Sequence, residues 1–358
     1  MSGLLVLNIG GIGDMVLATP ALRTIAAHRG GEPYDLLTSS RSIPLIEHAP
    51  FVRAIHTVDV SLLTGKRNMR SLVRLVASFF TLLMLRLKRY DTVIDLMAVE
   101  SPEASRRRKL LIDIIRPKTT VGRNTNGWAT FYDQWAPEEL LSDIHEVTRK
   151  LSVLRAADMI EESSGLELFS TEEDKVSADA LVESIGGDGS GGIAVLVPGS
   201  WRPTRRWDEE RFIAVGTAVF EKHGIPVIVC GGRDELDVID RVAGGIPGAV
   251  SLIDLPPRVL FELFRRVSIV ITNDTGPMHI AAAARAPIVS IFGPENPNRY
   301  APGGTESPGA VVSVGADCAP CVKFTCDDMK CLRGIDVEMV LEAVECLLSK
   351  QKGKPESV

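Results

Sequence analysis

The chain has 358 residues, of which 45% are apolar and 24% charged, a composition that excludes a disordered protein and suits two domains of ordinary size. The net charge of −6 and the aromatic content of 5% argue against a general nucleic-acid binder, so we expect no nucleic-acid partner. The first residues lack the basic stretch of a signal peptide, and the apolar run at 72–85, which contains Arg74, is too short to span a bilayer. We therefore expect a cytoplasmic protein.

In the first half of the chain, apolar runs alternate with helical patterns, as they do in a parallel, doubly wound α/β sheet. The predicted strands lie at 4–9, 34–39, 52–58 and 91–96, and the main helical stretches at 66–89 and 138–160. After the first strand, a glycine turn leads into a helical pattern through Leu17, Leu22 and Ile25. We assign residues 1–165 to an N-terminal Rossmann-like domain.

Between Glu161 and Gly192 the sequence becomes polar and glycine-rich, with one amphipathic helix at 173–186. We interpret 166–191 as the interdomain connection. The alternation then restarts, with strands at 192–199, 225–232, 249–254, 268–274 and 287–293. We assign 192–335 to a second Rossmann-like domain and 336–358 to a C-terminal helix and tail. Two such units leave a cleft between them, and their ligands bind at the carboxyl ends of the strands.

The first strand ends in a glycine turn. Gly10, Gly11 and Gly13 allow the backbone to turn sharply and to approach a ligand closely. They do not form the G-x-G-x-x-G fingerprint, because Met15 stands where the last glycine would be, and this disfavours a nicotinamide oxidoreductase. Asp14, at the start of the next helix, has two interpretations: a helix cap, or a carboxylate that accepts a proton in catalysis.

A second segment, Pro198 to Ser200, ends a strand and leads to Arg202, Arg205 and Arg206 before the next helix. Guanidinium groups match phosphate oxygens in a bidentate geometry, so three arginines at the carboxyl end of a strand form a candidate anion site. The alternative interpretation is ordinary solvated surface charge.

A third segment, 273–279, joins a strand to an alanine-rich helix. The N–H groups and the partial positive charge at the start of that helix would face a bound diphosphate. Thr275 is placed to cap the helix, and Gly276 leaves room for phosphate. His279 lies one turn further, within reach of a ligand oxygen, with a core histidine as the alternative. The turn at 293–296 ends the next strand and would border the same pocket.

Together and in this order, these segments resemble the bacterial heptosyltransferases of glycosyltransferase family 9, along nearly the whole chain. GIGDMVLATPALRTI is similar to the opening turn of the family, DIHEVTRKLSVL to its H-x-V-x-R-x-L segment, and PGS…TRRW to its P-G-(S/A)…K-R-W. NDTGPMHIAAA matches D-(T/S)-G-x-x-H-x-A-A, and CAPC…C…CL matches the C-terminal cysteine run. The resemblance implies a GT-B fold, with two Rossmann-like doubly wound domains facing across a cleft. It also implies that the N-terminal domain, 1–165, binds the acceptor and that the C-terminal domain, 192–335, binds the nucleotide-sugar donor.

The resemblance also implies an inverting, metal-independent glycosyltransferase that moves a sugar, heptose from ADP-heptose, onto a lipopolysaccharide core or a similar anionic glycan acceptor. By position, Asp14 is the expected general base. The expected donor site consists of Ser200, Arg205, Arg206, Asp274, Thr275, Gly276 and His279. Catalysis would need no cofactor: no D-x-D follows a strand to hold Mg²⁺, and arginines with a helix N-terminus would stabilise the leaving group.

The sequence departs from the family pattern in three places. Arg205 stands where the family usually has lysine, and Asp208 where it has proline. The acceptor-side D-L-(H/Q)-G-x-x-R-S stretch reads DLMAVESPEASRRR at 95–108, which leaves the identity of the acceptor open. The residues assigned to the acceptor side are Gly11, Gly13, Arg106, Arg107, Arg123 and His145.

Residues 66–123 contain fourteen Lys or Arg and five Asp or Glu, within a chain of negative net charge. Such asymmetry indicates an anionic partner, and a lipid-linked acceptor at the cytoplasmic face of the inner membrane is one. The apolar run from Leu75 to Leu85 would then lie transiently on that face. The alternative is a helix with one side in the core and one in water.

The chain has a C-terminal cysteine run, Cys318, Cys321, Cys326 and Cys331, whose spacing suits a structural zinc held by four thiolates. Buried or loosely paired thiols are the alternative. Neither interpretation makes these cysteines catalytic.

Two other functions also stay open: a nucleotide-sugar epimerase or hydrolase on a similar frame, and a non-catalytic nucleotide-sugar-binding protein. An epimerase or hydrolase would convert the donor in the absence of any acceptor.

Overall fold

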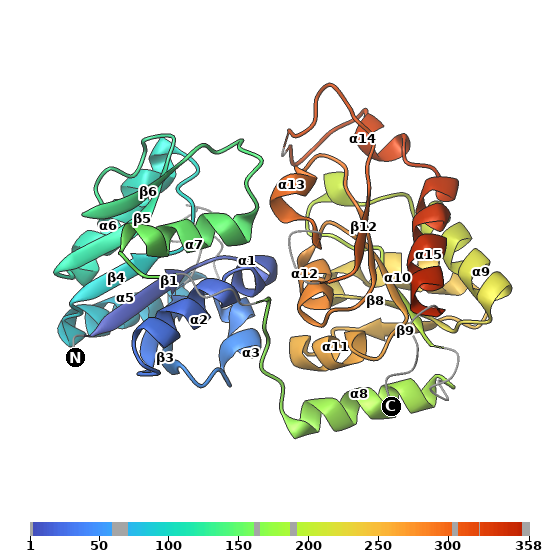
Figure 1. Ribbon diagram of the computed structural model, residues 1–358, viewed down its shortest axis with the longest axis horizontal. Coiled ribbons are helices and arrows are strands. Elements are labelled where there is room, and N and C mark those ends of the chain that lie inside the picture. Colours follow the sequence, from blue (N-terminus) through green and yellow to red (C-terminus); the bar gives the residue numbers. More distant parts are fainter. Residues whose placement is uncertain are drawn as a thin grey trace. The chain divides into compact units, whose positions relative to one another are not determined.

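The computed structural model describes residues 3–58, 71–160, 165–186, 192–302, 307–321 and 323–352. The chain divides into two compact units, unit 1 (Met1–Gly165) and unit 2 (Leu166–Val358) (Figure 1). Residues 66–70 of the predicted first long helix and the glycine-rich 187–191 lie outside the described residues.

Unit 1 contains a sheet of six parallel strands in the order β3-β2-β1-β4-β5-β6. The strands are β1 (Leu4–Asn8), β2 (Tyr34–Thr38), β3 (Val52–Thr57), β4 (Thr92–Asp95), β5 (Thr119–Thr125) and β6 (Gln134–Glu138). This is the Rossmann order, in which the chain winds outward in one direction from β1 and then in the other from β4. The switch point therefore lies between β1 and β4, where Leu5 pairs with Val93.

Helices cover both faces of this sheet (Figure 1). They are α1 (Ile12–Val16), α2 (Thr19–His28), η1 (Ser40–Ser42), α3 (Ile43–Ile46), α5 (Ser71–Lys88), α6 (Pro102–Ile115) and α7 (Glu146–Ala156). Every residue of β1 is buried, as expected for a central strand covered on both faces. Leu5, Leu7 and Val93 pack with Ile115 of α6 in one apolar cluster.

Unit 2 repeats the same winding with the order β12-β11-β10-β7-β8-β9. The strands are β7 (Ala194–Val197), β8 (Val227–Gly231), β9 (Val250–Ile253), β10 (Ile269–Asn273), β11 (Ile288–Ile291) and β12 (Gly309–Val312). All neighbouring pairs are parallel, and the switch point lies between β7 and β10.

The helical elements of unit 2 are α8 (Glu172–Ser184), η2 (Pro203–Arg205), α9 (Glu209–His223), η3 (Arg233–Glu235), α10 (Leu236–Gly245), α11 (Pro257–Phe264), α12 (Gly276–Ala283), α13 (Pro297–Tyr300), α14 (Lys330–Arg333) and α15 (Val337–Lys352). Helix α8 packs along α11, and its Asp174 accepts a hydrogen bond from Arg258 Nε at 2.9 Å. The C-terminal helix α15 packs against α9, with Val340 and Val344 in the core of unit 2 (Figure 1).

The predicted fold class is confirmed, and each of the nine predicted strands is present within a residue or two of its expected bounds. The sequence did not predict β5, β6 or β12. Strand β5, TTVGRNT, is polar because its buried side chains bind tertiary partners, and β6 carries Pro137, which an edge strand tolerates. The stretch expected to be helical from 138 becomes helical only at Glu146, and α6 was not predicted.

Among the helices of the described ranges, none combines the length and the apolar character needed to cross a membrane.

Candidate functional site

At the switch point of unit 2, two of the predicted segments emerge from neighbouring strands. Val197 of β7 pairs with Thr272 of β10, so the P-G-S turn and the 273–279 segment leave the sheet side by side. The buried carboxamide of Asn273 joins them: Nδ2 donates to the Pro198 carbonyl at 2.7 Å, and Oδ1 accepts from the Trp207 N–H at 3.1 Å. The motifs are therefore one structural unit.

The arginine–carboxylate cluster, defined here as Arg202, Arg205, Asp274 and Glu295, lies at this edge. Arg205 Nη1 is 3.1 Å from Asp274 Oδ2, and its Nη2 donates to Glu295 Oε1. Arg202 Nη1 donates to the same Glu295 oxygen at 2.8 Å. Both carboxylates are almost fully buried, at 3% and 5% exposed. The two guanidinium groups are thus held in place by acids that a bound anion would have to outcompete.

The ionisation of Asp274 is perturbed by its burial. Burial raises the pKa of Asp274 to about 6; Arg205 and Arg202 act in the opposite direction, and the nearby Glu295 adds to the increase. The carboxyl therefore gains or loses its proton near neutral pH, which changes the charge available to an anion at this edge.

Arg206 and Ser200 lie beside the cluster and bind each other: Arg206 Nε donates to the Ser200 carbonyl at 2.7 Å. Ser200 is 2% exposed, so it faces the interior. Arg206 is half-buried, and its contact fixes the P-G-S turn to the end of η2.

Helix α12 begins at the same edge. Thr275 occupies the N-cap position with extended backbone, as predicted, but its side chain makes no capping hydrogen bond. Gly276 and Pro277 follow, and no acid lies in the first turn, so the partial positive charge of the helix start is not neutralised there. His279, one turn into the helix, is buried with 6% of its surface exposed.

In unit 1, the opening turn leaves the sheet at its switch point, directly after β1. Asp14 Oδ2 accepts the Gly11 N–H at 2.8 Å, the capping contact of the simpler interpretation. Gly10 is required here, because a Cβ at this position would lie 2.5 Å from Asp14 Oδ2. Ser39 donates to the Gly10 carbonyl at 2.6 Å, so the turn is held from the neighbouring β2 end as well. Gly13 lies within α1, next to the half-buried Asp14.

Beneath this turn lies Lys150, which the sequence analysis did not single out. Its fully buried Nζ donates to Asn8 Oδ1 and to the Leu96 carbonyl, each at 3.2 Å, and lies 3.7 Å from Glu146 Oε1. Burial lowers the pKa of Lys150, while Glu146 and Asp14 act against that change. Lys150 ties α7 to the ends of β1 and β4, and its only signal in sequence was its place in the HEVTRK segment.

Two of the predicted acceptor-side residues make contacts that stabilise the fold. Arg123 is fully buried, and its guanidinium binds Glu138 (Nε to Oε2, 2.9 Å) and Glu146, so it is not available to an acceptor. His145 is the N-cap residue of α7, where Nδ1 accepts the Val147 N–H at 3.3 Å. A charged residue in a polar segment suggests a surface position. The buried acid partners of Arg123 are 15 and 23 residues away in sequence, so a local sequence pattern could not identify them.

The other two acceptor-side arginines lie on α6. Arg106 is exposed and pairs with Glu103 at 3.4 Å, and Arg107 is half-buried. The next residue, Arg108, turns inward to the buried Asp95, which also accepts Tyr132 OH at 2.7 Å. The run of three arginines is therefore split between the surface and the core.

All six cysteines are free thiols. Cys318, Cys321, Cys326 and Cys331 line one small pocket near η2, where Thr204 Oγ1 donates to the Lys323 carbonyl at 2.7 Å. However, within the described part of the chain no three His, Cys, Asp or Glu side chains are arranged to hold a metal ion. Cys331 is buried, Cys321 and Cys326 are half-buried and Cys318 is exposed, so the choice between a structural zinc and buried or loosely paired thiols stays a prediction.

We expect Arg123→Met to lower the free energy of unfolding by about 3–5 kcal/mol, because it removes the closest cation from the buried carboxylates of Glu138 and Glu146. The matched change Arg106→Met removes an exposed pair and should cost less than about 1 kcal/mol. Urea denaturation followed by circular dichroism measures both. Equal effects of the two changes would contradict the buried position of Arg123.

The raised pKa of Asp274 predicts a pH-dependent stability. Because the folded state favours the protonated acid, this contribution is complete below the ordinary pKa near 4 and is lost as the pH rises through about 6. Relative to Asp274→Asn, the free energy of unfolding of the wild type should fall between pH 4 and 7, by on the order of 3 kcal/mol at most. If urea titrations gave the same pH dependence of the free energy of unfolding for both proteins, the raised pKa of Asp274 would be refuted.

The chain is similar to one family of known proteins over most of its length. The family model described as "Glycosyltransferase family 9 (heptosyltransferase)" matches residues 84–332. Lipopolysaccharide heptosyltransferase 3 of Escherichia coli K12 is 24% identical over 291 residues, which cover 78% of this chain and 79% of that protein.

Solved structures share the architecture. A glycosyltransferase family 9 protein of Veillonella parvula superimposes with a TM-score of 0.78 at 22% identity, covering 98% of this chain and 97% of that one. Escherichia coli heptosyltransferase WaaC with ADP-2-deoxy-2-fluoro heptose superimposes with a TM-score of 0.68 at 15% identity, covering 96% and 98%. At these identities the likeness concerns the fold, and the GT-B architecture of two Rossmann-like units is shared.

Proposed function

The chain belongs to glycosyltransferase family 9, and we propose that it is an inverting, metal-independent enzyme that moves heptose from ADP-heptose onto a lipopolysaccharide core or a similar anionic glycan. The observation that carries the proposal is the convergence, at the switch point of unit 2, of the arginine–carboxylate cluster and the start of α12. Open α/β sheets bind their ligands at this point.

The donor's diphosphate would bind at this edge of unit 2. Arg205 and Arg206 offer guanidinium groups, and Gly276 at the start of α12 leaves N–H groups and space for phosphate oxygens. His279, one turn further, would contact a ligand oxygen. A phosphate that takes over the Arg205 contacts releases Asp274 and Glu295 from their cation, and Asp274 can then accept a proton because its pKa is already raised. The structure of WaaC with ADP-2-deoxy-2-fluoro heptose supports the choice of donor.

Asp14 would be the general base. Its carboxylate is oriented by the Gly11 N–H and held over Gly10, so it has a defined direction before any acceptor binds. In the proposed reaction, Asp14 takes the proton of an acceptor hydroxyl, and the hydroxyl oxygen forms a bond to C1 of the sugar. The bond from C1 to the phosphate oxygen breaks, and ADP leaves with that electron pair. A single displacement of this kind inverts the configuration at C1.

The charge that develops on the leaving diphosphate needs a fixed cation or dipole nearby. Arg202 and Arg205 supply two guanidinium groups, and α12 adds its N-terminal N–H groups. Fixed donors of this type stabilise a developing oxyanion without reorganisation. We therefore propose that the chain's own cations take the role that Mg²⁺ has in metal-dependent transferases.

The acceptor side would lie on unit 1, near Gly11, Gly13, Arg106 and Arg107. The exposed Arg106 and the half-buried Arg107 on α6 suit an acceptor rich in phosphate and carboxylate. We propose that the protein works at the cytoplasmic face of the inner membrane, where it meets a lipid-linked acceptor transiently. Six free thiols are consistent with a reducing compartment.

Replacing the proposed base tests the mechanism directly. We expect Asp14→Asn to reduce kcat about 10²–10⁴-fold, the range for loss of a general base, with little change in the KM for ADP-heptose. Transfer to short core-oligosaccharide acceptors is measured by mass spectrometry. Glu32→Gln, an exposed acid of the same unit paired with Arg29, serves as the control and should retain full activity. Undiminished transfer by Asp14→Asn would move the base elsewhere, and donor turnover without acceptor would indicate an epimerase or hydrolase.

The proposed metal independence has its own test. We expect transfer to persist in EDTA with unchanged rate, because Arg202 and Arg205 supply the cations beside the leaving group. The rate is followed by ADP release and product mass. Activity that disappears in EDTA and returns with Mg²⁺ would contradict this part of the mechanism while leaving sugar transfer intact.

A further inference from the structure

Helix α5 exposes a continuous apolar stripe. Six large apolar side chains, spaced three and four residues apart and thus on one face of the helix, are between 40% and 72% exposed. The apolar stripe consists of Val76, Phe79, Phe80, Leu83, Met84 and Leu87. Single exposed apolar residues are common, but a contiguous set marks an interaction surface.

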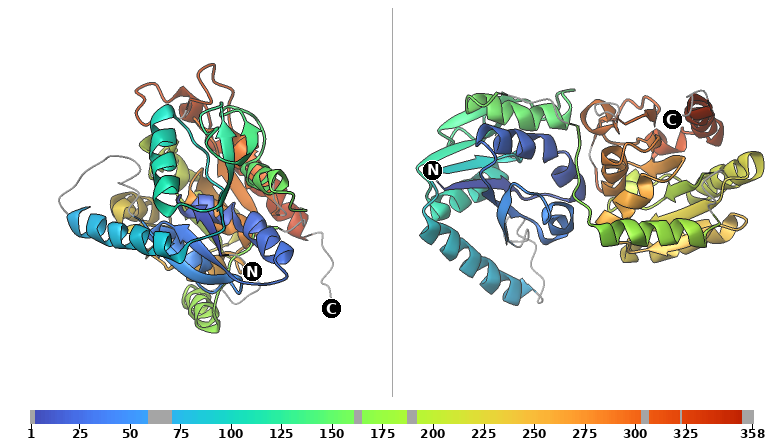
Figure 2. Two further views of the ribbon diagram at one scale, coloured as in Figure 1. Left: turned by 90° about the vertical axis from the view of Figure 1, so that its left-hand side faces the viewer. Right: turned by 60° about the horizontal axis from the view of Figure 1, so that its bottom comes forward.

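The opposite face of α5 is the one that packs on unit 1. Ser78 and Leu85 are buried, and Leu82 packs against the core cluster. At the end of the helix, Lys88 Nζ donates to the buried Asp35 Oδ2 at 2.9 Å and Arg86 Nη1 to the Ile114 carbonyl at 3.1 Å. The core-facing side of α5 is therefore already satisfied, and the stripe is a second, separate apolar face. In both views of Figure 2, α5 (light blue) lies at the outside of its unit.

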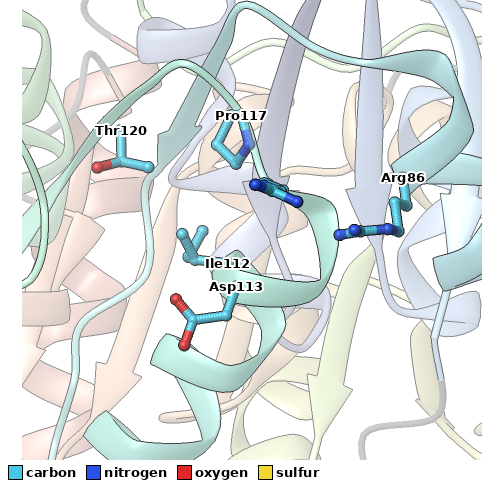
Figure 3. Close-up of a pocket in the computed structure, with 6 residues that line it drawn as sticks. Arg86, Ile112, Asp113, Pro117 and Thr120 are labelled. Atoms are coloured by element: carbon cyan, nitrogen blue, oxygen red, sulfur yellow. The ribbon is translucent and has the colours of Figure 1, made fainter.

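Basic residues lie at the C-terminal end of the stripe, where the ammonium of Lys88 is bound to Asp35 and Arg86 and Arg89 are exposed. At 100° per residue, Arg86 and Lys88 fall on opposite flanks of Leu87, and Arg89 follows directly. The Arg86 guanidinium reaches an open hollow of about 380 Å³, which Arg116 also lines. Figure 3 shows Arg86 on one side of this hollow and Thr120 on the other, with Ile112 and Asp113 of α6. The Asp113 carboxylate is paired with Lys109 at 2.7 Å, so the two arginines keep the hollow attractive to an anion.

An apolar stripe with cations at one end suits one occupant in particular. In an anionic bilayer, apolar side chains enter the boundary between head groups and acyl chains, while lysine and arginine extend to lipid phosphates. A second copy of the chain would present the same apolar stripe and the same basic end, and therefore no opposite charge. Charge complementarity therefore favours an anionic lipid surface over self-association.

We propose that α5 docks unit 1 on an anionic lipid bilayer, with the apolar stripe in the interfacial layer and the hollow between Arg86 and Arg116 receiving a lipid phosphate. This deepens the proposed function, because a lipid-linked acceptor would be met at that surface. Lipid binding itself does not depend on catalysis, so the two can fail separately.

The test is co-sedimentation of the purified full chain with vesicles of phosphatidylcholine, alone or mixed with phosphatidylglycerol. We expect binding to the mixed vesicles and much weaker binding to phosphatidylcholine alone. Phe79→Asp/Phe80→Asp should weaken binding at least about tenfold, because it places charge in the middle of the stripe. The control Val176→Asp changes an apolar residue that is 61% exposed on α8 and should leave binding unchanged. Arg116→Gln should reduce binding to the anionic vesicles only.

The proposal would be overturned if the wild type bound neither kind of vesicle, or if the double variant bound as well as the wild type. It would also be overturned if sedimentation velocity showed a wild-type dimer that the double substitution dissociates, with no binding to vesicles. Thermal melting confirms that each variant is folded. Transfer to a lipid-free acceptor should be the same in the double variant and the wild type. If neither protein transferred sugar to the lipid-free acceptor, this would count against the proposed function and not against membrane docking.

Discussion

The site in each unit depends on one constraint: within its parallel sheet, the direction in which successive strands are added reverses once. Strands β1 and β4, and likewise β7 and β10, are neighbours whose chains continue in opposite directions, so the segments that follow them separate and leave polar backbone exposed at the carboxyl edge. In unit 2 that edge holds the arginine–carboxylate cluster and the start of α12. In unit 1 it holds Asp14 and its glycine turn.

At both switch points, a buried polar side chain fixes the geometry. Asn273 satisfies one donor and one acceptor and joins the turn after β7 to the end of β10. In unit 1, Lys150 donates to two acceptors and so joins α7 to the ends of β1 and β4. Buried polar groups are stable only when their hydrogen bonds are made, so each of these residues specifies one arrangement of the turns above it. The exposed residues near the edges can then vary without loss of that arrangement.

Helix α5 presents apolar side chains on two separate faces. Its inner face completes the core of unit 1, and its outer face repeats the apolar pattern of a buried helix in an exposed position. From composition alone, such a helix is indistinguishable from one that is buried all round. The basic residues at its end explain why this second face suits an anionic bilayer better than another protein face.

The sequence by itself determined the α/β class, the nine apolar strands and the positions of the turns, because burial on both faces of a parallel sheet leaves a continuous apolar run that glycine, proline and aspartate then interrupt. Resemblance of short segments placed Asp14, Arg205 and Asp274 in candidate sites. Only the tertiary structure decided that Arg123 belongs to the core, that Glu295 joins Arg205, and that β5 is a strand. Each of these depends on a partner that is distant in sequence. A charged side chain suggests a surface position, and only the folded structure shows the buried opposite charge that allows it to lie in the core.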